Sequence, residues 1–271
     1  MTITVALVYP DLLGTYGDSG NATILAERLR WRGHDARVLR IASGAPVPES
    51  AEFYVIGGGE DLPQVLAASK LIASRSLHRA VEGGAVVLAI CAGLQILGQA
   101  FVGLDGQASD GLGLLGCVTV RSNAPRAIGE VLVRPAEEWS AEVLGRLGGL
   151  GGLGSLSGFE NHGAVTELLP GTGTRPVGTV TTGVGNKDGT LEGAVSGRVW
   201  GTYLHGPVLA RNPRLADLLL SWVIGDLAPI DDSEAEALHA ERVEHGPAER
   251  RSGGASQEHP RRLMGRFTRR K

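Results

Sequence analysis

An apolar run that ends in a cysteine is the feature that most limits what this chain can fold into. Residues Ala85–Ile90 have the length and composition of a buried strand, and Cys91 follows them directly. Two small residues, Ala92 and Gly93, come next, and apolar residues then recur at the spacing of a helix. The pattern predicts a strand that turns sharply at Cys91 and continues as a helix.

A turn of this kind suits a nucleophile. It presents the sulfur of Cys91 at the end of a strand and at the start of a helix, whose dipole favours a negatively charged thiolate. It also directs the backbone N–H of Ala92 toward the place where an oxyanion would form during attack on a carbonyl group. The alternative is a cysteine buried in the core, which is the usual fate of a free cysteine.

The first ninety residues alternate between short apolar runs and amphipathic segments. Strands are expected at Thr4–Tyr9, Asp35–Ile41, Glu52–Ile56 and Ala85–Ile90, and a helix at Asn21–Arg32. Continuous apolar strands separated by helices indicate a parallel sheet that is covered on both faces. We therefore predict a doubly wound, mostly parallel α/β fold, whose functional site lies at the carboxyl ends of the strands.

The second half of the chain has a stronger β pattern, which predicts extra antiparallel structure. Candidate strands are Cys117–Arg121, Ile128–Arg134, Val177–Val184, Glu192–Val195 and Arg198–Tyr203, and Asn212–Val223 is the candidate closing helix. The glycine-rich run 147–158 is expected to be a flexible surface insertion.

The chain divides near residue 228. Residues 1–228 are predicted to form the main domain, and residues 229–271 a charged C-terminal extension. Within that extension, Asp231–Glu244 is expected to be helical, and the part from Gly246 onward is expected to be disordered.

Charge and cysteine content exclude several classes of function. The chain has 26 basic and 29 acidic residues, but six of the basic ones lie among the last eleven residues, which leaves the remainder with a net charge of −9. A body this acidic does not suit nucleic-acid binding. The two cysteines form neither a disulfide framework nor a zinc motif, so no metal is expected. With no signal peptide and no apolar run of the roughly 18 residues that a spanning helix needs, we predict a cytoplasmic protein without a transmembrane segment.

Two further segments are candidates for the chemistry around Cys91. The turn Gly57–Glu60 follows the third strand, and Gly58 in it is a candidate second donor to an oxyanion. His205 ends the apolar run that begins at Val199, so it can act as a base for a nucleophile at the end of a neighbouring strand. His162 is the competing histidine, but its sequence context is typical of a polar loop that binds or orients substrate.

These motifs resemble the glutaminase domains of the cobyric acid synthase type, a family of class I glutamine amidotransferases with a flavodoxin-like fold. The matching segments are Cys91–Gln95, Gly57–Gly59, Gly158–Gly163 and Gly201–Gly206, and the resemblance runs from about residue 3 to residue 225. Within the family the chain is most similar to the glutaminase subunits of lipid II isoglutaminyl synthases, on the segments Tyr16–Asn21 and Asn123–Glu130.

The resemblance implies a set of site residues. Cys91 and His205 would be catalytic, and Gly58 and Ala92 would form the oxyanion hole. Substrate binding would fall to Arg126, Gln95, Asn161 and His162. A guanidinium such as that of Arg126 can bind the α-carboxylate of glutamine through two parallel hydrogen bonds. Without the resemblance, Arg126 would be interpreted as a solvated arginine at the edge of a strand.

The resemblance also implies a division of labour between two subunits. This chain would hydrolyse L-glutamine and would need no cofactor of its own. A Mur-ligase-like partner, using ATP and Mg²⁺, would activate the D-glutamate of the lipid II stem peptide. Ammonia would pass from one subunit of this heterodimer to the other, and the product would be D-isoglutamine for peptidoglycan synthesis.

The acid that should orient the catalytic histidine is missing from its usual place. Many class I amidotransferases have a glutamate two residues after the histidine, where this chain has Pro207. An imidazole needs a partner on its far nitrogen, so we expect the partner subunit to supply an acid, with Asp18, Glu60 and Glu160 as internal alternatives. Three other functions stay open: the glutaminase of a cobyrinate-type corrin amidase, a catalytically silent binding subunit, and a cysteine hydrolase on the same scaffold.

Overall fold

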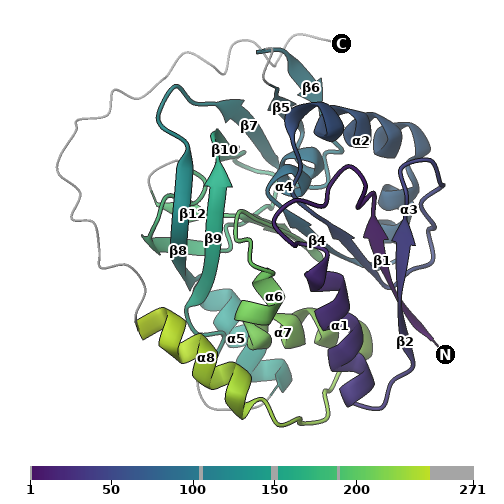
Figure 1. The fold of residues 1–271 in the computed structure, drawn as a ribbon, viewed down its shortest axis with the longest axis vertical. Helices are drawn as coiled ribbons and strands as arrows, with labels where there is room; N and C mark the ends of the chain where they lie inside the picture. Colours follow the sequence, from purple (N-terminus) through teal and green to yellow (C-terminus); the bar gives the residue numbers. More distant parts are fainter. Residues whose placement is uncertain (1, 104–105, 148–151, 188–189, 245–271) are drawn as a thin grey trace.

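The structure is a computed structural model of the 271-residue chain, and it describes residues 2–103, 106–147, 152–187 and 190–244 (Figure 1). The elements of the first half are β1 (Ile3–Val8), α1 (Gly20–Trp31), β2 (Ala36–Ile41), β3 (Phe53–Ile56), α2 (Asp61–Ser74), α3 (Ser76–Glu82), β4 (Val86–Ile90), α4 (Ala92–Leu97), β5 (Ala100–Val102), β6 (Ala108–Asp110) and β7 (Cys117–Arg121). Those of the second half are β8 (Ala127–Pro135), α5 (Glu137–Leu147), β9 (Leu156–His162), β10 (Ala164–Leu168), β11 (Gly178–Thr182), β12 (Leu191–Glu192), β13 (Ala194–Ser196), β14 (Val199–Thr202), α6 (Val208–Arg211), α7 (Pro213–Ile224) and α8 (Ser233–Glu244).

A six-stranded sheet forms the centre of the fold, with the strand order β13-β14-β4-β3-β1-β2. Its strands pair in parallel except for the edge strand β13, which is antiparallel to β14. Helices α1 and α7 lie against one face, and α2, α3 and α4 lie on the other (Figure 1). The predicted doubly wound, mostly parallel α/β fold is therefore confirmed.

Helices on both faces of the central sheet explain why its inner strands are continuous apolar segments in the sequence. Every residue of β1, β3 and β4 is buried, because helices exclude water from both faces of the sheet. Strand β2 lies at the edge and contains exposed positions, which is why its sequence, Ala36–Ile41, carries two arginines.

Two smaller four-stranded sheets extend the second half of the chain, as predicted. One has the order β10-β7-β5-β6 and the other β12-β11-β8-β9. All pairs in the second of them are antiparallel, and β8 runs along the full length of β9. This pairing brings the strand after Arg126 beside the strand that contains Asn161 and His162.

The expectation of a flexible surface insertion over 147–158 is wrong for its second half. Residues 148–151 lie outside the described residues, but Leu153 is buried and β9 already begins at Leu156. A Cβ at Gly158 would lie 2.5 Å from the side chain of Leu204. At least this glycine serves close packing, because it lets β9 approach the segment that leads to His205.

The first part of the C-terminal extension packs on the main domain. The expected helix is present as α8, which contacts α6 and β9. Just before it, Asp232 accepts a 2.9 Å hydrogen bond from Nη1 of the buried Arg28, which also binds Asp217. The disorder predicted from Gly246 falls on residues outside those described. In the described part of the chain, no helix combines the length and the apolar character needed to cross a lipid bilayer.

Candidate active site

Cys91 lies at a strained turn between β4 and α4, as the sequence predicts. Its backbone has φ 52° and ψ −105°, a conformation that a residue with a side chain rarely adopts outside a functional turn. The turn is fixed from two sides. The N–H of Cys91 donates a 2.8 Å hydrogen bond to the carbonyl oxygen of Thr202, and a Cβ at Gly93 would lie 2.7 Å from the carbonyl oxygen of Ile56.

His205 follows β14, the strand next to the one that leads to Cys91. Strands β4 and β14 are parallel neighbours in register, with Ile90 opposite Thr202, so Cys91 and His205 leave the sheet at the same edge. The backbone of His205 also exchanges hydrogen bonds with Phe159 of β9 in both directions, at 2.9 and 3.1 Å. The imidazole is almost fully buried.

Asp18 is the acid on the far nitrogen of His205. Its carboxylate oxygens lie 2.9 and 3.0 Å from Nδ1, and the side chain is completely buried. A carboxylate accepts hydrogen bonds only, so Nδ1 carries a proton. Nε2 makes no hydrogen bond within the described residues, and Cys91 is the other group that raises the pKa of the ring. The chain itself therefore places a carboxylate where the partner subunit was expected to supply one.

The other two internal acids serve different purposes. Glu60 lies at the N-terminal end of α2 without a side-chain hydrogen bond to the helix. Glu160 accepts hydrogen bonds from the backbone N–H groups of Val184 and Gly185, both at 2.8 Å. Neither contacts the imidazole of His205 through a recorded hydrogen bond, whereas Asp18 does.

The site favours the protonated form of His205. Burial is the largest effect and acts to lower the pKa, but interactions with Asp18 and then with Cys91 outweigh it and raise the pKa of His205 from 6.5 to about 9. An imidazolium beside a thiolate is the resting state of many cysteine-dependent hydrolases, in which the histidine later protonates the leaving group.

Gly58 lies at the site, but its N–H is already used. It donates a 2.9 Å hydrogen bond to Oδ2 of Asp18, and a Cβ at this position would lie 2.9 Å from Cε1 of His205. The predicted role as an oxyanion donor would require this bond to break. The next residue, Gly59, lines the cavity beside Cys91 instead.

A small cavity of about 50 Å³ opens at the sulfur of Cys91. The structure brings together around it six of the predicted residues, namely Cys91, Ala92, Gln95, Arg126, Asn161 and His162. Among the lining residues that were not predicted, three have polar or charged side chains: Asp61, Gln64 and Arg121. Nε2 of Gln64 donates a 2.9 Å hydrogen bond to Oε1 of Gln95, and Arg121 lies 3.7 Å from Asp61 as an ion pair.

A chain of hydrogen bonds begins at two residues that line this cavity, Arg126 and Asn161. Nε of Arg126 donates to Oδ1 of Asn161 at 2.5 Å, and Nδ2 of Asn161 donates to the hydroxyl of Tyr16 at 2.6 Å. The ring of Tyr16 also packs against His205, with 4.8 Å between ring centroids. Arg126 and Asn161 are thus linked to His205 through Tyr16.

His162 is not in a polar loop, as the sequence had suggested. It ends strand β9 and is buried, and its ring stacks on Tyr203 with 3.9 Å between centroids. Its Nδ1 lies 3.1 Å from the carbonyl oxygen of Ala164. The alternation of β9 was hidden by Gly158 and by the polar residues around it.

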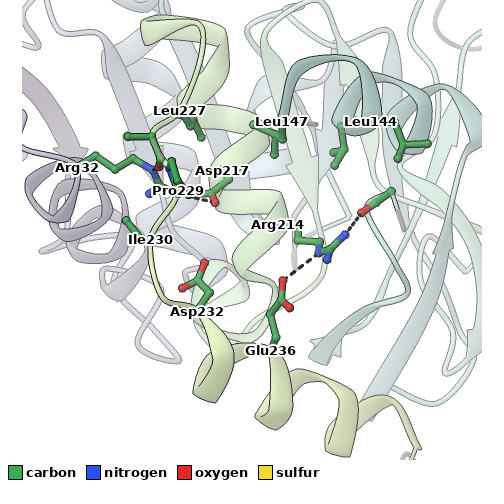
Figure 2. A pocket seen from close by; sticks show the side chains of 13 residues that line it. Arg32, Leu144, Leu147, Arg214, Asp217, Leu227, Pro229, Ile230, Asp232 and Glu236 are labelled. Carbon is green, nitrogen blue, oxygen red and sulfur yellow. Dashed lines mark hydrogen bonds and ion pairs between the residues drawn. The ribbon is translucent and has the colours of Figure 1, made fainter. Parts of the chain in front are cut away.

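A larger cavity, of about 390 Å³, lies elsewhere, between α5, α7 and the segment 227–232 (Figure 2). Its charged side chains are paired: Arg214 binds Glu236, and Arg32 binds Asp217. No cysteine or histidine lines it, so the chemistry belongs to the smaller cavity at Cys91. The described residues also include no group of His, Cys, Asp and Glu side chains arranged to hold a metal ion.

Comparison with known families agrees with this geometry. Residues 4–213 match the family described as the CobB/CobQ-like glutamine amidotransferase domain. This chain belongs to that family. It is therefore a glutamine amidotransferase domain, the class of enzyme that hydrolyses glutamine, and the predicted resemblance is confirmed.

Two curated members of the family match most of the chain. The subunit GatD of the glutamine-hydrolysing lipid II isoglutaminyl synthase of Streptococcus pneumoniae is 32% identical over 225 residues, which cover 82% of this chain and 80% of that protein. The subunit of the same name from Staphylococcus aureus is 33% identical, over 80% of this chain and 83% of that protein. A cobyric acid synthase of Sinorhizobium medicae is 33% identical over 70% of this chain but only 36% of its own length.

A solved structure supports the fold. A crystal structure of a glutamine amidotransferase superposes with a TM-score of 0.50 at 19% identity and covers 82% of this chain and 98% of the other. At this identity the likeness concerns the fold alone.

Proposed function

We propose that this amidotransferase domain is the glutaminase subunit of an enzyme that amidates lipid II. The observation that carries the chemistry is the Asp18–His205 pair placed beside Cys91 at the cavity. The substrate assignment rests on the two GatD relatives, which share about four fifths of their length with this chain, whereas the cobyric acid synthase shares about a third of its own.

The proposed reaction uses Cys91 as the nucleophile. Its thiolate attacks the side-chain amide carbon of glutamine, and the C–N bond of the resulting tetrahedral intermediate breaks as His205 gives its proton to the departing ammonia. Water then attacks the thioester, His205 takes a proton from that water, and the C–S bond breaks to release glutamate and the free Cys91. The N–H of Ala92 is the proposed donor to the oxyanion of both intermediates.

The proposed binding site for the glutamine backbone lies on the opposite wall of the cavity. Arg126 would bind the α-carboxylate with its guanidinium, and the carboxylate of Asp61 would face the α-ammonium group. Gln95 and Asn161 offer amide groups to the substrate between these ends.

A Mur-ligase-like partner would receive the ammonia and amidate the D-glutamate of the lipid II stem peptide with ATP and Mg²⁺. The partner would activate glutamine hydrolysis by acting on the turn that contains Gly58, and it would not need to supply an acid to His205. Asp18 already lies at His205, but the same carboxylate holds the N–H of Gly58 away from an oxyanion. Docking that frees this N–H would raise kcat.

The first test is covalent labelling. A diazoketone analogue of glutamine should label Cys91 and leave Cys117 unmodified, because Cys117 is fully buried and desolvation raises its pKa to about 12. Cys91→Ala should remove both labelling and glutaminase activity, while the matched control Cys117→Ser should keep both. Labelling of Cys117, or full turnover by Cys91→Ala, would overturn the assignment.

The second test identifies the acceptor. The chain is co-purified with its native partner and incubated with glutamine and ATP, with either lipid II or a corrin carboxylate as acceptor. Amidation of lipid II supports the proposal. Amidation of the corrin alone would show instead a cobyrinate-type amidase.

A further inference from the structure

We propose that Glu192 is a positioning residue, which fixes Cys91 and His205 relative to one another by holding the backbone at Thr202 and Tyr203. The inference rests on the proposed roles of Cys91 and His205. Glu192 contacts neither of them in a recorded hydrogen bond and was predicted from the sequence only as part of a strand.

The side chain of Glu192 binds the end of β14 with a single oxygen atom. Oε1 accepts a 2.7 Å hydrogen bond from the N–H of Tyr203 and a 2.8 Å hydrogen bond from the hydroxyl of Thr202. That hydroxyl in turn accepts a 3.1 Å hydrogen bond from the N–H of Leu204. Three consecutive residues before His205 are therefore held by one carboxylate and the hydroxyl that it binds.

The same segment carries the contact that fixes the nucleophile. The carbonyl oxygen of Thr202 accepts the hydrogen bond from the N–H of Cys91, at 2.8 Å. A shift of the backbone at Thr202 would move the strained turn at Cys91, and a shift at Tyr203 and Leu204 would move His205. Glu192 thus acts on both members of the pair through one stretch of backbone.

Glu192 is itself held firmly. Its carbonyl oxygen accepts a 2.9 Å hydrogen bond from the N–H of Val177, and the side chain of Asn186 binds both the N–H and the carbonyl oxygen of Gly193, at 2.7 and 3.0 Å. Gly193 has φ +66°, and a Cβ there would lie 2.6 Å from the carbonyl oxygen of Gly201, so only glycine lets this strand approach β14 so closely. The carboxylate therefore ties the sheet that contains β12 to the catalytic end of the central sheet.

The position of Tyr203 also affects the substrate cavity. Its hydroxyl accepts a 3.1 Å hydrogen bond from Nε2 of Gln95, which lines that cavity, and lies 2.6 Å from the hydroxyl of Thr166. Its ring stacks on His162. Holding the backbone of Tyr203 therefore also fixes the wall that faces the substrate.

A carboxylate is a costly choice for a purely structural link. Glu192 is fully buried, and Oε2 has no hydrogen-bond partner within the described residues. Desolvation raises the pKa of Glu192 to about 7. Oε1 acts only as an acceptor toward Thr202 and Tyr203, so the amide oxygen of glutamine can reproduce both hydrogen bonds. This separates geometry from charge experimentally, because glutamine keeps the reach and the acceptor, whereas aspartate keeps the charge but is one methylene too short.

The test compares Glu192→Gln, Glu192→Asp and Glu192→Ala in the full chain. We measure kcat and KM for glutamine and, separately, the rate at which iodoacetamide alkylates Cys91. The alkylation rate reports the placement of the sulfur beside His205 without requiring turnover. Asn212→Ala is the matched control, since Asn212 is also buried and binds backbone groups, at Ser157 and Val208, but is not part of the site.

We expect Glu192→Ala and Glu192→Asp to lower kcat by about tenfold to a hundredfold and to slow alkylation in parallel, with a smaller change in KM, as small misplacements of reacting groups do. Glu192→Gln should restore both rates to within about threefold of the wild-type values, and Asn212→Ala should lose stability without losing kcat. If Glu192→Ala does not fold, the Gln and Asp variants still decide. Wild-type rates in Glu192→Asp, or an inactive Glu192→Gln that folds, would overturn the proposal. An inactive wild type that still shows these differences in alkylation would refute the proposed function but not the role of Glu192.

Discussion

Replacing Asp18 by asparagine is the sharpest perturbation that the site offers. Asparagine has the same size but presents one oxygen and one NH₂ group. Both carboxylate oxygens of Asp18 face Nδ1–H of His205, and Oδ2 also accepts the N–H of Gly58. In Asp18→Asn, the NH₂ group replaces one of these oxygens and faces the Nδ1–H donor, and the negative charge beside His205 is lost.

The magnitude follows from the pKa of His205. It is raised from 6.5 to about 9 although burial acts to lower it, and Asp18 is the first of the groups that raise it. The net rise corresponds to about 3 kcal/mol in favour of the imidazolium. We therefore expect Asp18→Asn to lower kcat by about tenfold to several hundredfold.

The pH profile provides a second reading. His205 must carry a proton to release ammonia, so in the wild type the acylation rate should fall as pH rises through about 9. Loss of the carboxylate charge lowers the pKa of His205, and the alkaline limb of kcat/KM should move toward neutral pH in Asp18→Asn. Both are measured by stopped assays of glutamate formation across the pH range.

Asp11→Asn is the matched control. Asp11 lies on the same connection between β1 and α1, but is exposed and binds Ser43 instead. Its variant should keep both kcat and the alkaline limb. If Asp18→Asn behaves in the same way, Asp18 does not orient His205, and the acid must come from the partner subunit after all.

Three further outcomes are expected. Arg126→Ala should raise KM for glutamine by an amount that corresponds to about 1.5–3 kcal/mol. Arg126→Lys should recover only part of this loss, because an ammonium group cannot bind a carboxylate through two parallel hydrogen bonds. An unchanged KM in steady-state assays would make Arg126 a surface residue. Between pH 4.5 and about 7, the folded state holds the proton of Glu192 more tightly than the unfolded state does. The free energy of unfolding, measured with urea, should therefore fall by up to about 3 kcal/mol as pH rises through this window. The variant Glu192→Gln should show no such fall. Truncation before Gly246 should leave the melting temperature and kcat unchanged, because the removed sequence lacks the apolar residues to join a core; a loss of either would place it in the domain.

The parts of the fold that could be predicted share one property, which is that burial alone determined their sequence. The strands β1, β3 and β4 are covered on both faces and are therefore continuous apolar runs. Cys91 was identifiable because the run Ala85–Ile90 ends there, and His205 because it ends another apolar run that could pair beside the first.

The parts that could not be predicted depend on contacts between distant segments. Asp18 and His205 are 187 positions apart, and a Gly-Asp-Ser-Gly sequence is typical of an ordinary turn. The strand order offered a signal: β1 pairs with β3, and β3 with β4, so the loop after β1 ends near the loop that contains Gly58. Strand β9 was missed because Gly158 serves close packing against Leu204, and this requirement interrupts the period-two pattern of the strand.

Cys91 and Asp18, the two residues that interact with His205, differ in how the rest of the molecule holds them. Cys91 is anchored by a backbone hydrogen bond inside the central sheet. Asp18 reaches His205 from the irregular connection between β1 and α1, where its own N–H makes a 3.4 Å hydrogen bond within a local turn, to the carbonyl oxygen of Thr15. Local opening of such a connection takes less free energy than global unfolding. Gentle warming should therefore disconnect the acid while the sheet stays intact. Hydrogen exchange at Asp18 would then accelerate well before exchange at Cys91, and glutaminase activity would decline reversibly below the melting temperature.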